Sequence, residues 1–331
     1  MASATARVRC LVVGRYPEPD LDLVQRLAGP EVELVVIPPE QSSAEVGTVD
    51  CIWRLFSGRL VGVSPDPFVD ALASHPEVRW VHTVSAGLDQ MAELLAGRPG
   101  VILTNSVGVV ATPIAEFVVG CLLQHCKRYP ELWAHQGQHS WEALPLRELG
   151  DLRVVVFGLG AIGTATARLL APFGARVVAV RRHPDLGGDG LVQSVHPQED
   201  FQLVCQGADA VVLAAPLTAE TRGVVDDRLL ARLNQGSCLV NIARGGLIDE
   251  QALLSRLRSG PLQAAYLDAF EEEPLPPGSP LWDAPGVFIS PHVSWSSANF
   301  TRRTCELFGE QLRRFAQGQP LRNLADPVRG Y

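Results

Sequence analysis

The sequence predicts an α/β protein with parallel β-sheets, divided into about two domains. Short runs rich in β-branched residues alternate with amphipathic stretches, which is typical of strand–helix–strand units. The chain has 331 residues, roughly twice the length of an average domain. Apolar residues make up 47 % of the chain and charged residues 19 %, which indicates a well-packed protein and excludes extensive disorder.

The first half of the chain contains short strand-like runs and two helical stretches. The expected strands are Val8–Val13, Glu33–Ile37, Cys51–Leu55, Arg79–Val84 and Val101–Thr104. The expected helices are Pro67–Ser74 and Thr112–Lys127. Pro113 fits the first turn of the second helix, where a missing N–H costs little. The segment Tyr129–Gly150 has no clean period, so we expect an irregular connecting arm there.

The second half alternates more regularly. The expected strands are Asp151–Phe157, Arg176–Val180, Ala210–Ala214, Ser237–Ile242, Gln263–Leu267 and Val287–Ser290. The expected helices are Ile162–Ala171, Asp226–Leu233, Asp249–Arg258 and Ser297–Ala316. The Pro-rich piece Glu273–Pro280 is too short for a domain linker and is interpreted as a structured loop.

Charge and cysteine content exclude several classes of function. The net charge of −8 argues against nucleic acid or an anionic membrane as the main partner. The longest apolar runs are strand-sized, and the first ten residues do not resemble a secretory signal. The seven cysteines lack metal-binding spacing, so we expect no metal site and free thiols in a reducing cytoplasm.

A glycine-rich motif follows the strand that ends at Phe157. Gly158, Leu159, Gly160, Ala161, Ile162 and Gly163 match the G-x-G-x-x-G pattern. The glycines allow a tight turn, close approach of a pyrophosphate and close helix–strand packing. A helix begins at the motif, and its N-terminal N–H groups attract phosphate. The sequence therefore predicts a dinucleotide-binding unit.

Two arginines stand where an NAD-binding unit usually has a carboxylate for the ribose 2′-hydroxyl. The second strand of the unit ends at Val180 and is followed by Arg181 and Arg182. A guanidinium matches a phosphate in charge and geometry, so these residues favour NADP over NAD. A solvated basic strand end is the alternative interpretation.

Three polar residues follow separate strands of the second half. Arg244, Glu273 and His292 come after the strands that end near Ile242, Leu267 and Ser290. Strand ends of a parallel sheet border the ligand crevice, so these residues can meet one substrate. Reduction of a ketone needs a cation beside the oxygen and an acid, roles that suit an arginine and a carboxylate-supported histidine. Solvated loop residues are the alternative interpretation.

Six sequence blocks resemble the D-isomer-specific 2-hydroxyacid dehydrogenase family. They are NIARGGLIDE (241–250), LDAFEEEPL (267–275), ISPH (289–292), SAGLD (85–89), TPIAEF (112–117) and APLTAET (215–221). They occur in the family's order between about residues 78 and 292. The first sixty residues resemble the family only in strand pattern.

The resemblance implies two Rossmann-like or flavodoxin-like domains with a cleft between them. Residues 1–105 and 292–331 would form the substrate domain, and residues 106–291 the dinucleotide-binding domain. The family's catalytic residues correspond to Arg244, Glu273 and His292. The substrate-binding positions correspond to Ser85, Ala86 and Gly87, whose backbone would hold a carboxylate, and to Arg244. Further cofactor positions correspond to Pro216, Thr221, Ile242, Ala243, Arg244, Asp268, His292 and Ser294.

Trp295 departs from the family pattern, because relatives often carry a small residue there. It is expected to narrow the substrate pocket or cover the nicotinamide, and packing between domains is the alternative. In relatives the helix Thr112–Lys127 and the arm after it form a dimer interface, so we expect a homodimer.

These features predict an NAD(P)-dependent D-2-hydroxyacid dehydrogenase that acts as a reductase of glyoxylate, hydroxypyruvate or a related 2-oxoacid, with NADP(H) favoured over NAD(H). One alternative is a cofactor-sensing binding protein like the family's transcriptional corepressor, which typically has flexible tails that this sequence lacks. Another is a relative that acts on a different small acid, such as formate or phosphite.

Overall fold

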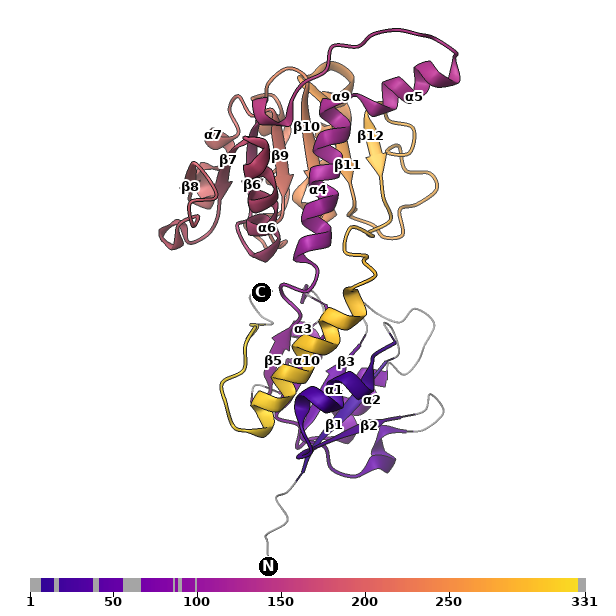
Figure 1. The fold of residues 1–331 in the computed structure, drawn as a ribbon, viewed down its shortest axis with the longest axis vertical. Helices are drawn as coiled ribbons and strands as arrows, with labels where there is room; N and C mark the ends of the chain where they lie inside the picture. The colour runs from indigo at the N-terminus through magenta and orange to yellow at the C-terminus, as the bar shows by residue number, and fades with distance from the viewer. Residues whose placement is uncertain are drawn as a thin grey trace, which may run out of the picture. The chain divides into compact units, whose positions relative to one another are not determined.

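A computed structural model describes residues 7–14, 18–37, 42–55, 67–85, 87–88, 91–98 and 100–326. Packing divides the chain into two units (Figure 1). Unit 1 comprises Met1–Val109 and Ser297–Tyr331, and unit 2 comprises Val110–Ser296. The sequence analysis drew the corresponding boundaries after residues 105 and 291. Each unit has its own sheet and its own core.

Unit 2 is a doubly wound parallel sheet of seven strands. The strands are β6 (Arg153–Phe157), β7 (Arg176–Val180), β8 (Ser194–His196), β9 (Ala210–Leu213), β10 (Ser237–Asn241), β11 (Leu262–Leu267) and β12 (Val287–Ile289). Their order is β12-β11-β10-β9-β6-β7-β8, and all pairs are parallel. The order reverses between β6 and β9, as in the Rossmann fold, where ligands bind beyond the carboxyl ends of the strands.

Helices cover both faces of this sheet. They are α4 (Ala111–Cys126), α6 (Ala161–Leu170), α7 (Phe201–Val204), α8 (Asp227–Leu230) and α9 (Glu250–Ser259), whereas α5 (Tyr129–Gly137) buries none of its residues. Val154 and Val156 of β6 belong to the apolar cluster under α4 and α6, which lie side by side in Figure 1. Val155 and Phe157 belong to the cluster on the opposite face, with α7, α8 and α9. The alternation follows from the two-residue period of a strand.

Unit 1 contains a five-stranded parallel sheet in the order β2-β1-β3-β4-β5, which is flavodoxin-like. The strands are β1 (Val8–Val13), β2 (Val32–Val36), β3 (Cys51–Arg54), β4 (Trp80–Thr83) and β5 (Ile102–Asn105). The helices are α1 (Leu21–Ala28), α2 (Pro67–Ser74), α3 (Met91–Leu95) and α10 (Phe300–Ala316). α1 and α10 pack together, and Phe308 of α10 stacks on Trp53 of β3 with ring centroids 4.1 Å apart.

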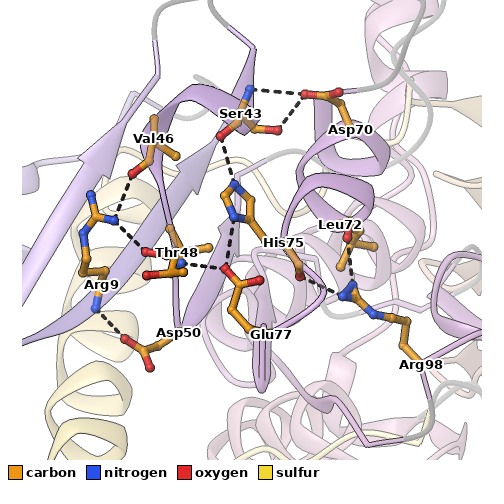
Figure 2. Close-up of polar contacts among 11 residues, drawn as sticks. Arg9, Ser43, Val46, Thr48, Asp50, Asp70, Leu72, His75, Glu77 and Arg98 are labelled. Atoms are coloured by element: carbon orange, nitrogen blue, oxygen red, sulfur yellow. Dashed lines mark hydrogen bonds and ion pairs between the residues drawn. The ribbon is translucent and has the colours of Figure 1, made fainter.

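A polar cluster closes the amino-terminal edge of the unit 1 sheet (Figure 2). His75 lies between the backbone carbonyl of Ser43, 3.0 Å from Nε2, and the Glu77 carboxylate, 3.3 Å from Nδ1. The Ser43 hydroxyl donates to Asp70 at 2.7 Å. These bonds join the short 3₁₀ turn Ser43–Val46 to α2. The cluster therefore has a structural role. It lies at the amino-terminal edge of the unit 1 sheet, whereas the predicted site residues Ser85 and Gly87 follow the carboxyl end of β4.

Among the described residues, four helices (α1, α3, α5 and α7) and one strand (β8) were not predicted from the sequence. The expected irregular arm begins with the helix α5, which buries none of its residues and therefore has no apolar period to detect. The helix α1 begins after Asp20, whose carboxylate accepts from the N–H of Leu23. The short edge strand β8 is also absent from the predictions. Among the described residues we find no helix with the length and apolar character needed to cross a membrane.

Candidate active site

The three predicted catalytic residues meet at the carboxyl edge of three neighbouring strands in unit 2. Arg244 follows β10, Glu273 follows β11 and His292 follows β12, and these strands are adjacent in the sheet. The imidazole Nδ1 of His292 donates to Oε2 of Glu273 at 2.8 Å. The charge of Arg244 acts on both residues of this pair. The fold therefore brings together residues that are up to 48 positions apart in the sequence (292 − 244 = 48).

The pairing favours a charged imidazole. The hydrogen bond to Glu273 raises the pKa of His292 and outweighs burial and the nearby Arg244, which lower it. Burial alone would raise the pKa of Glu273, but hydrogen bonds from His292 and from the N–H of Phe270 bring it below its usual value. The pair therefore holds a proton on the imidazole, as a general acid requires. Among the described residues, Nε2 of His292 has no hydrogen-bond partner, so it is available to a substrate.

A buried asparagine shapes the loop that carries Arg244. The Asn241 side chain is fully buried, donates to the carbonyl of Arg244 at 3.0 Å and accepts from the N–H of Ala243 at 3.1 Å. Ile242 and Ala243 are buried in the same loop. The Arg244 guanidinium also donates to the carbonyl of Ala243 at 2.8 Å. The loop conformation is therefore fixed by the sequence around the arginine.

Asp268 organises the loop that carries His292. This buried carboxylate accepts from the Ser290 hydroxyl at 2.5 Å, the Val293 N–H at 2.9 Å and the Ser294 N–H at 3.0 Å. Both carboxylate oxygens are used in these bonds. The structure thus places Asp268 and Ser294, both predicted at the cofactor, in the framework that holds the histidine loop.

The glycine-rich loop fits a dinucleotide. Gly158 has a φ of 102°, and a Cβ there would lie 2.6 Å from the backbone of Ala214. A Cβ on Gly163 would lie 2.0 Å from the carbonyl oxygen of Gly158. A Cβ on Gly160 would meet nothing within 4 Å, so the space in front of the α6 N-terminus is open. The loop therefore packs tightly at Gly158 and Gly163 and leaves room for phosphates next to Gly160.

The predicted arginines lie at the carboxyl end of β7, beside the glycine-rich loop that follows β6. The Arg181 guanidinium donates to the carbonyl of Gly187 at 3.2 Å, and Arg182 is exposed with its charge acting on Glu220. Both predicted arginines thus follow the same strand end, next to the glycine-rich loop. In the loop after β9, the buried Thr221 hydroxyl donates to the carbonyl of Pro216 at 2.8 Å, so Thr221 closes this loop.

The predicted site residues of unit 2 share one sheet edge. They are Gly158, Leu159, Gly160, Ala161, Ile162 and Gly163 after β6, Arg181 and Arg182 after β7, Pro216 and Thr221 after β9, Ile242, Ala243 and Arg244 after β10, Asp268 and Glu273 after β11, and His292, Ser294 and Trp295 after β12. Ser85 and Gly87 belong to unit 1 and follow β4, with the Gly87 N–H donating to the Ser85 hydroxyl at 3.2 Å. Ala86 lies outside the described residues.

Comparison with known proteins decides the family. The model for the NAD-binding domain of D-isomer specific 2-hydroxyacid dehydrogenases matches residues 119–294, more than half of the chain. The chain belongs to the D-isomer specific 2-hydroxyacid dehydrogenase family. A glyoxylate/hydroxypyruvate reductase A of Yersinia enterocolitica is 30% identical over 271 residues, which cover 80% of this chain and 85% of the relative. A glyoxylate reductase of Thermofilum pendens is 28% identical over 326 residues, which cover 95% and 93%.

Solved structures of this dehydrogenase family share the fold. One from Xanthobacter autotrophicus Py2, in complex with NADPH and MES, has 30% identity and a TM-score of 0.80, with 98% of this chain and 100% of that chain covered. The NADPH-dependent glyoxylate/hydroxypyruvate reductase of Sinorhizobium meliloti, in complex with NADP and sulfate, has 28% identity and a TM-score of 0.79, with the same coverage. The sequence prediction of the family and of two parallel-sheet α/β domains is confirmed.

The sequence analysis of this dehydrogenase missed the residues whose hydrogen bonds support the catalytic pair and its loops. Asn241 stands inside the block NIARGG but was interpreted only as part of a strand. Ser290 and the N–H of Phe270 also support the catalytic pair or its loops. A buried polar residue at a strand end is the signal that identifies Asn241, because such a side chain must find hydrogen-bond partners. No sequence signal identifies the Phe270 N–H, since every residue except proline has a backbone N–H.

Proposed function

We propose that this protein reduces a small 2-oxoacid to the D-2-hydroxyacid with NADPH. The observation that supports this most directly is the 2.8 Å bond between His292 and Glu273 at the same sheet edge as Arg244 and the glycine-rich loop. Glyoxylate and hydroxypyruvate are the first candidate substrates, because relatives over most of the chain carry the names of glyoxylate and hydroxypyruvate reductases.

Each residue of the candidate site has a role in this reaction. When bound, NADPH supplies a hydride to the carbonyl carbon. Arg244 stabilises the negative charge that develops on the carbonyl oxygen and binds the neighbouring carboxylate. His292 donates a proton from Nε2 to that oxygen, and Glu273 stabilises the imidazolium before the transfer. The Ser85–Gly87 backbone and Arg244 are assigned to the substrate carboxylate, on the family resemblance.

The cofactor is assigned to the open space at the start of α6. The residues Gly158–Gly163 would bind the pyrophosphate, and the loops that carry Pro216, Thr221, Ile242 and Ala243 would line the rest of the site. Asp268 and Ser294 would shape its nicotinamide end through the histidine loop. Arg181 and Arg182 would bind the 2′-phosphate, which supports NADPH over NADH.

The preference for NADPH is tested by Arg181→Ala. We expect the KM for NADPH to rise about tenfold or more, with little change in the KM for NADH, because only NADPH has the 2′-phosphate. Arg176→Ala removes an arginine from the opposite end of the same strand and serves as the matched control. A wild-type enzyme that prefers NADH would contradict the assignment.

The reaction itself is tested by following NADPH oxidation with a panel of 2-oxoacids. The panel includes glyoxylate, hydroxypyruvate, pyruvate and a branched 2-oxoacid, with NADH in parallel. We expect turnover of at least one small member and a D-configured product. Binding of NADPH without turnover of any member would contradict the proposal and favour a cofactor-sensing protein.

We also propose a homodimer located in the cytoplasm. α5 and the segment after it expose large aromatic side chains: Trp133 is 59% exposed and Trp141 fully exposed. Exposed apolar groups of this kind favour a protein interface, and the family resemblance assigns this region to a dimer contact. The seven free cysteines suit a reducing compartment. Light scattering should give twice the mass of 35.7 kDa, and a monomeric mass at micromolar concentration would contradict the dimer.

A further inference from the structure

The catalytic histidine has a backbone conformation that side chains rarely adopt. His292 has a φ of 51°, in the left-handed region that favours glycine. A residue with a side chain remains in this region only where surrounding contacts hold it. The orientation of the imidazole depends on this conformation, because the ring is attached to the same Cα. The contacts around the His292 backbone therefore decide where its proton is delivered.

One set of contacts holds the residues after His292. The buried Asp268 carboxylate accepts from the N–H groups of Val293 and Ser294 at 2.9 and 3.0 Å. The N–H of His292 itself donates to the carbonyl of Ser290 at 3.0 Å. These three bonds attach the loop to the Asp268 carboxylate and to the Ser290 carbonyl, but none of them involves the carbonyl of His292.

The indole of Trp295 holds that carbonyl. Its Nε1–H donates to the carbonyl oxygen of His292 at 2.8 Å. In an ordinary β-turn the backbone N–H of residue i+3 donates to the carbonyl of residue i. Here the side-chain N–H of residue i+3, Trp295, donates to the carbonyl of His292 instead. Within the described part of the chain, no other group donates to this oxygen. The ring of Trp295 is partly buried against the apolar cluster that contains Ile114 and Ile242, so its position is fixed by packing.

We propose that Trp295 is a positioning residue for the reductase reaction: its indole N–H fixes the His292 peptide and so directs the imidazole toward Glu273 on one side and the substrate oxygen on the other. The inference rests on the proposed function, in which His292 donates the proton. It assigns Trp295 a role through its N–H, in addition to any contact of its ring with substrate. Loss of a single such bond can displace a catalytic group enough to slow the reaction strongly.

The decisive variant is Trp295→Phe, which removes the N–H and keeps an aromatic ring. With glyoxylate and NADPH as probes, we expect kcat to fall about 3- to 30-fold while the KM for NADPH stays within about twofold. A residue that only lines the pocket would instead change the KM for oxoacids of different size and leave kcat intact. Trp295 replaced by β-(3-benzothienyl)alanine, which has the shape of tryptophan without the N–H, should reproduce the loss if the phenylalanine variant folds poorly.

Trp282→Phe is the matched control. The Trp282 indole also donates to a backbone carbonyl of unit 2, that of Pro276, at 2.9 Å, and its ring is half exposed. The substitution removes the same kind of bond at similar length away from the histidine loop. We expect kcat and the pH profile to remain those of the wild type.

A titration of His292 separates this inference from the proposed function, because it needs no turnover. The imidazole signal, identified by its loss in His292→Gln, is followed by NMR as a function of pH. The charged groups that act on the ring are Glu273, Arg244 and Asp268. In Trp295→Phe the ring should lose its fixed approach to Glu273, so its pKa should fall toward 6.5. A wild-type titration in both Trp295 variants, or wild-type kcat, would overturn the inference even in an active reductase.

Discussion

The bond from Nδ1 to Glu273 favours the protonated imidazole of His292, and within the described part of the chain no group bonds to its Nε2. Replacement by alanine removes the general acid and leaves the glycine-rich loop untouched. We expect His292→Ala to lower kcat by about 10²- to 10⁴-fold with little change in the affinity for NADPH. Steady-state kinetics and a fluorescence titration with NADPH measure the two effects. Full activity of the variant would refute the role.

The pH profile of reduction follows from the direction of the histidine shift. The protonated imidazole is the active form, and the bond to Glu273 raises its pKa above the ordinary 6.5. The value of kcat/KM should therefore be level below the raised pKa and fall up to tenfold per pH unit above it. In Glu273→Gln the neutral amide no longer stabilises the cation, so the fall should begin at lower pH. Identical profiles for the two proteins would contradict the assignment of Glu273.

Individual residues show how far the site could be predicted from the sequence. Arg244, Glu273 and His292 were found because each follows a strand and each has a side chain suited to carbonyl reduction. The bond from Trp295 to the His292 carbonyl was beyond prediction, because it depends on a left-handed backbone that the sequence does not reveal. Asp268 was predicted as a cofactor position from the family resemblance, but its three hydrogen bonds were not, because they join groups that only the folded loop brings together.

At the scale of elements, two glycines at the start of α6 allow an effect on stability to be distinguished from an effect on cofactor binding. A methyl group on Gly160 would meet nothing within 4 Å, whereas one on Gly163 would lie 2.0 Å from a backbone oxygen. We expect Gly160→Ala to fold with wild-type stability but to bind NADPH at least tenfold more weakly, because the methyl group fills the phosphate site.

The paired variant Gly163→Ala should lower the free energy of unfolding by about 1–3 kcal/mol, because the helix must move away from β6. Thermal unfolding and NADPH titration of both variants measure the contrast. Equal effects of the two substitutions on stability would contradict the presence of open space next to Gly160.

Elements with a strong apolar period agreed best with their predictions. β7 was predicted with its observed ends because four apolar residues follow Arg176 and two arginines stop the run. α4 was found within one residue, since most of its length is buried. α5 was missed for the opposite reason: it buries none of its residues, so its helical conformation has no counterpart in the pattern. Burial thus explains α4 and α5, whereas α1 was missed although it buries Val24 and Ala28.

At the scale of the whole molecule, a buried histidine in unit 1 makes stability depend on pH. His82 is fully buried between the hydroxyls of Thr104 and Ser106, at 2.7 and 3.2 Å, and burial lowers its pKa to about 3. The unfolded chain binds a proton near pH 6.5, while the folded chain stays neutral until about pH 3. Between these values the unfolded state binds more protons, so stability falls as the pH falls.

We expect His82 alone to contribute up to about 1.4 kcal/mol per pH unit to this fall. Urea unfolding followed by tryptophan fluorescence at pH 7, 6 and 5 measures it, because Trp53 and Trp80 lie in the same unit. The His82→Gln variant provides the control, since its side chain does not titrate. An equal dependence on pH in both proteins would show that His82 is not the cause.

The stacking of Phe308 on Trp53 has a consequence for how the protein is made. Phe308, together with Cys305 and Leu312 of α10, completes a core cluster whose remaining buried members, such as Val12 and Trp80, lie in the first 80 residues. A ribosome must therefore translate the whole of unit 2 before unit 1 receives its last layer. The inserted unit can finish folding while this face of the first sheet is covered by α1 but not yet by α10. Nascent chains arrested before residue 297 should show a protease-resistant unit 2 and a protease-sensitive amino-terminal part, so the amino-terminal segment is the portion most exposed to chaperones during synthesis.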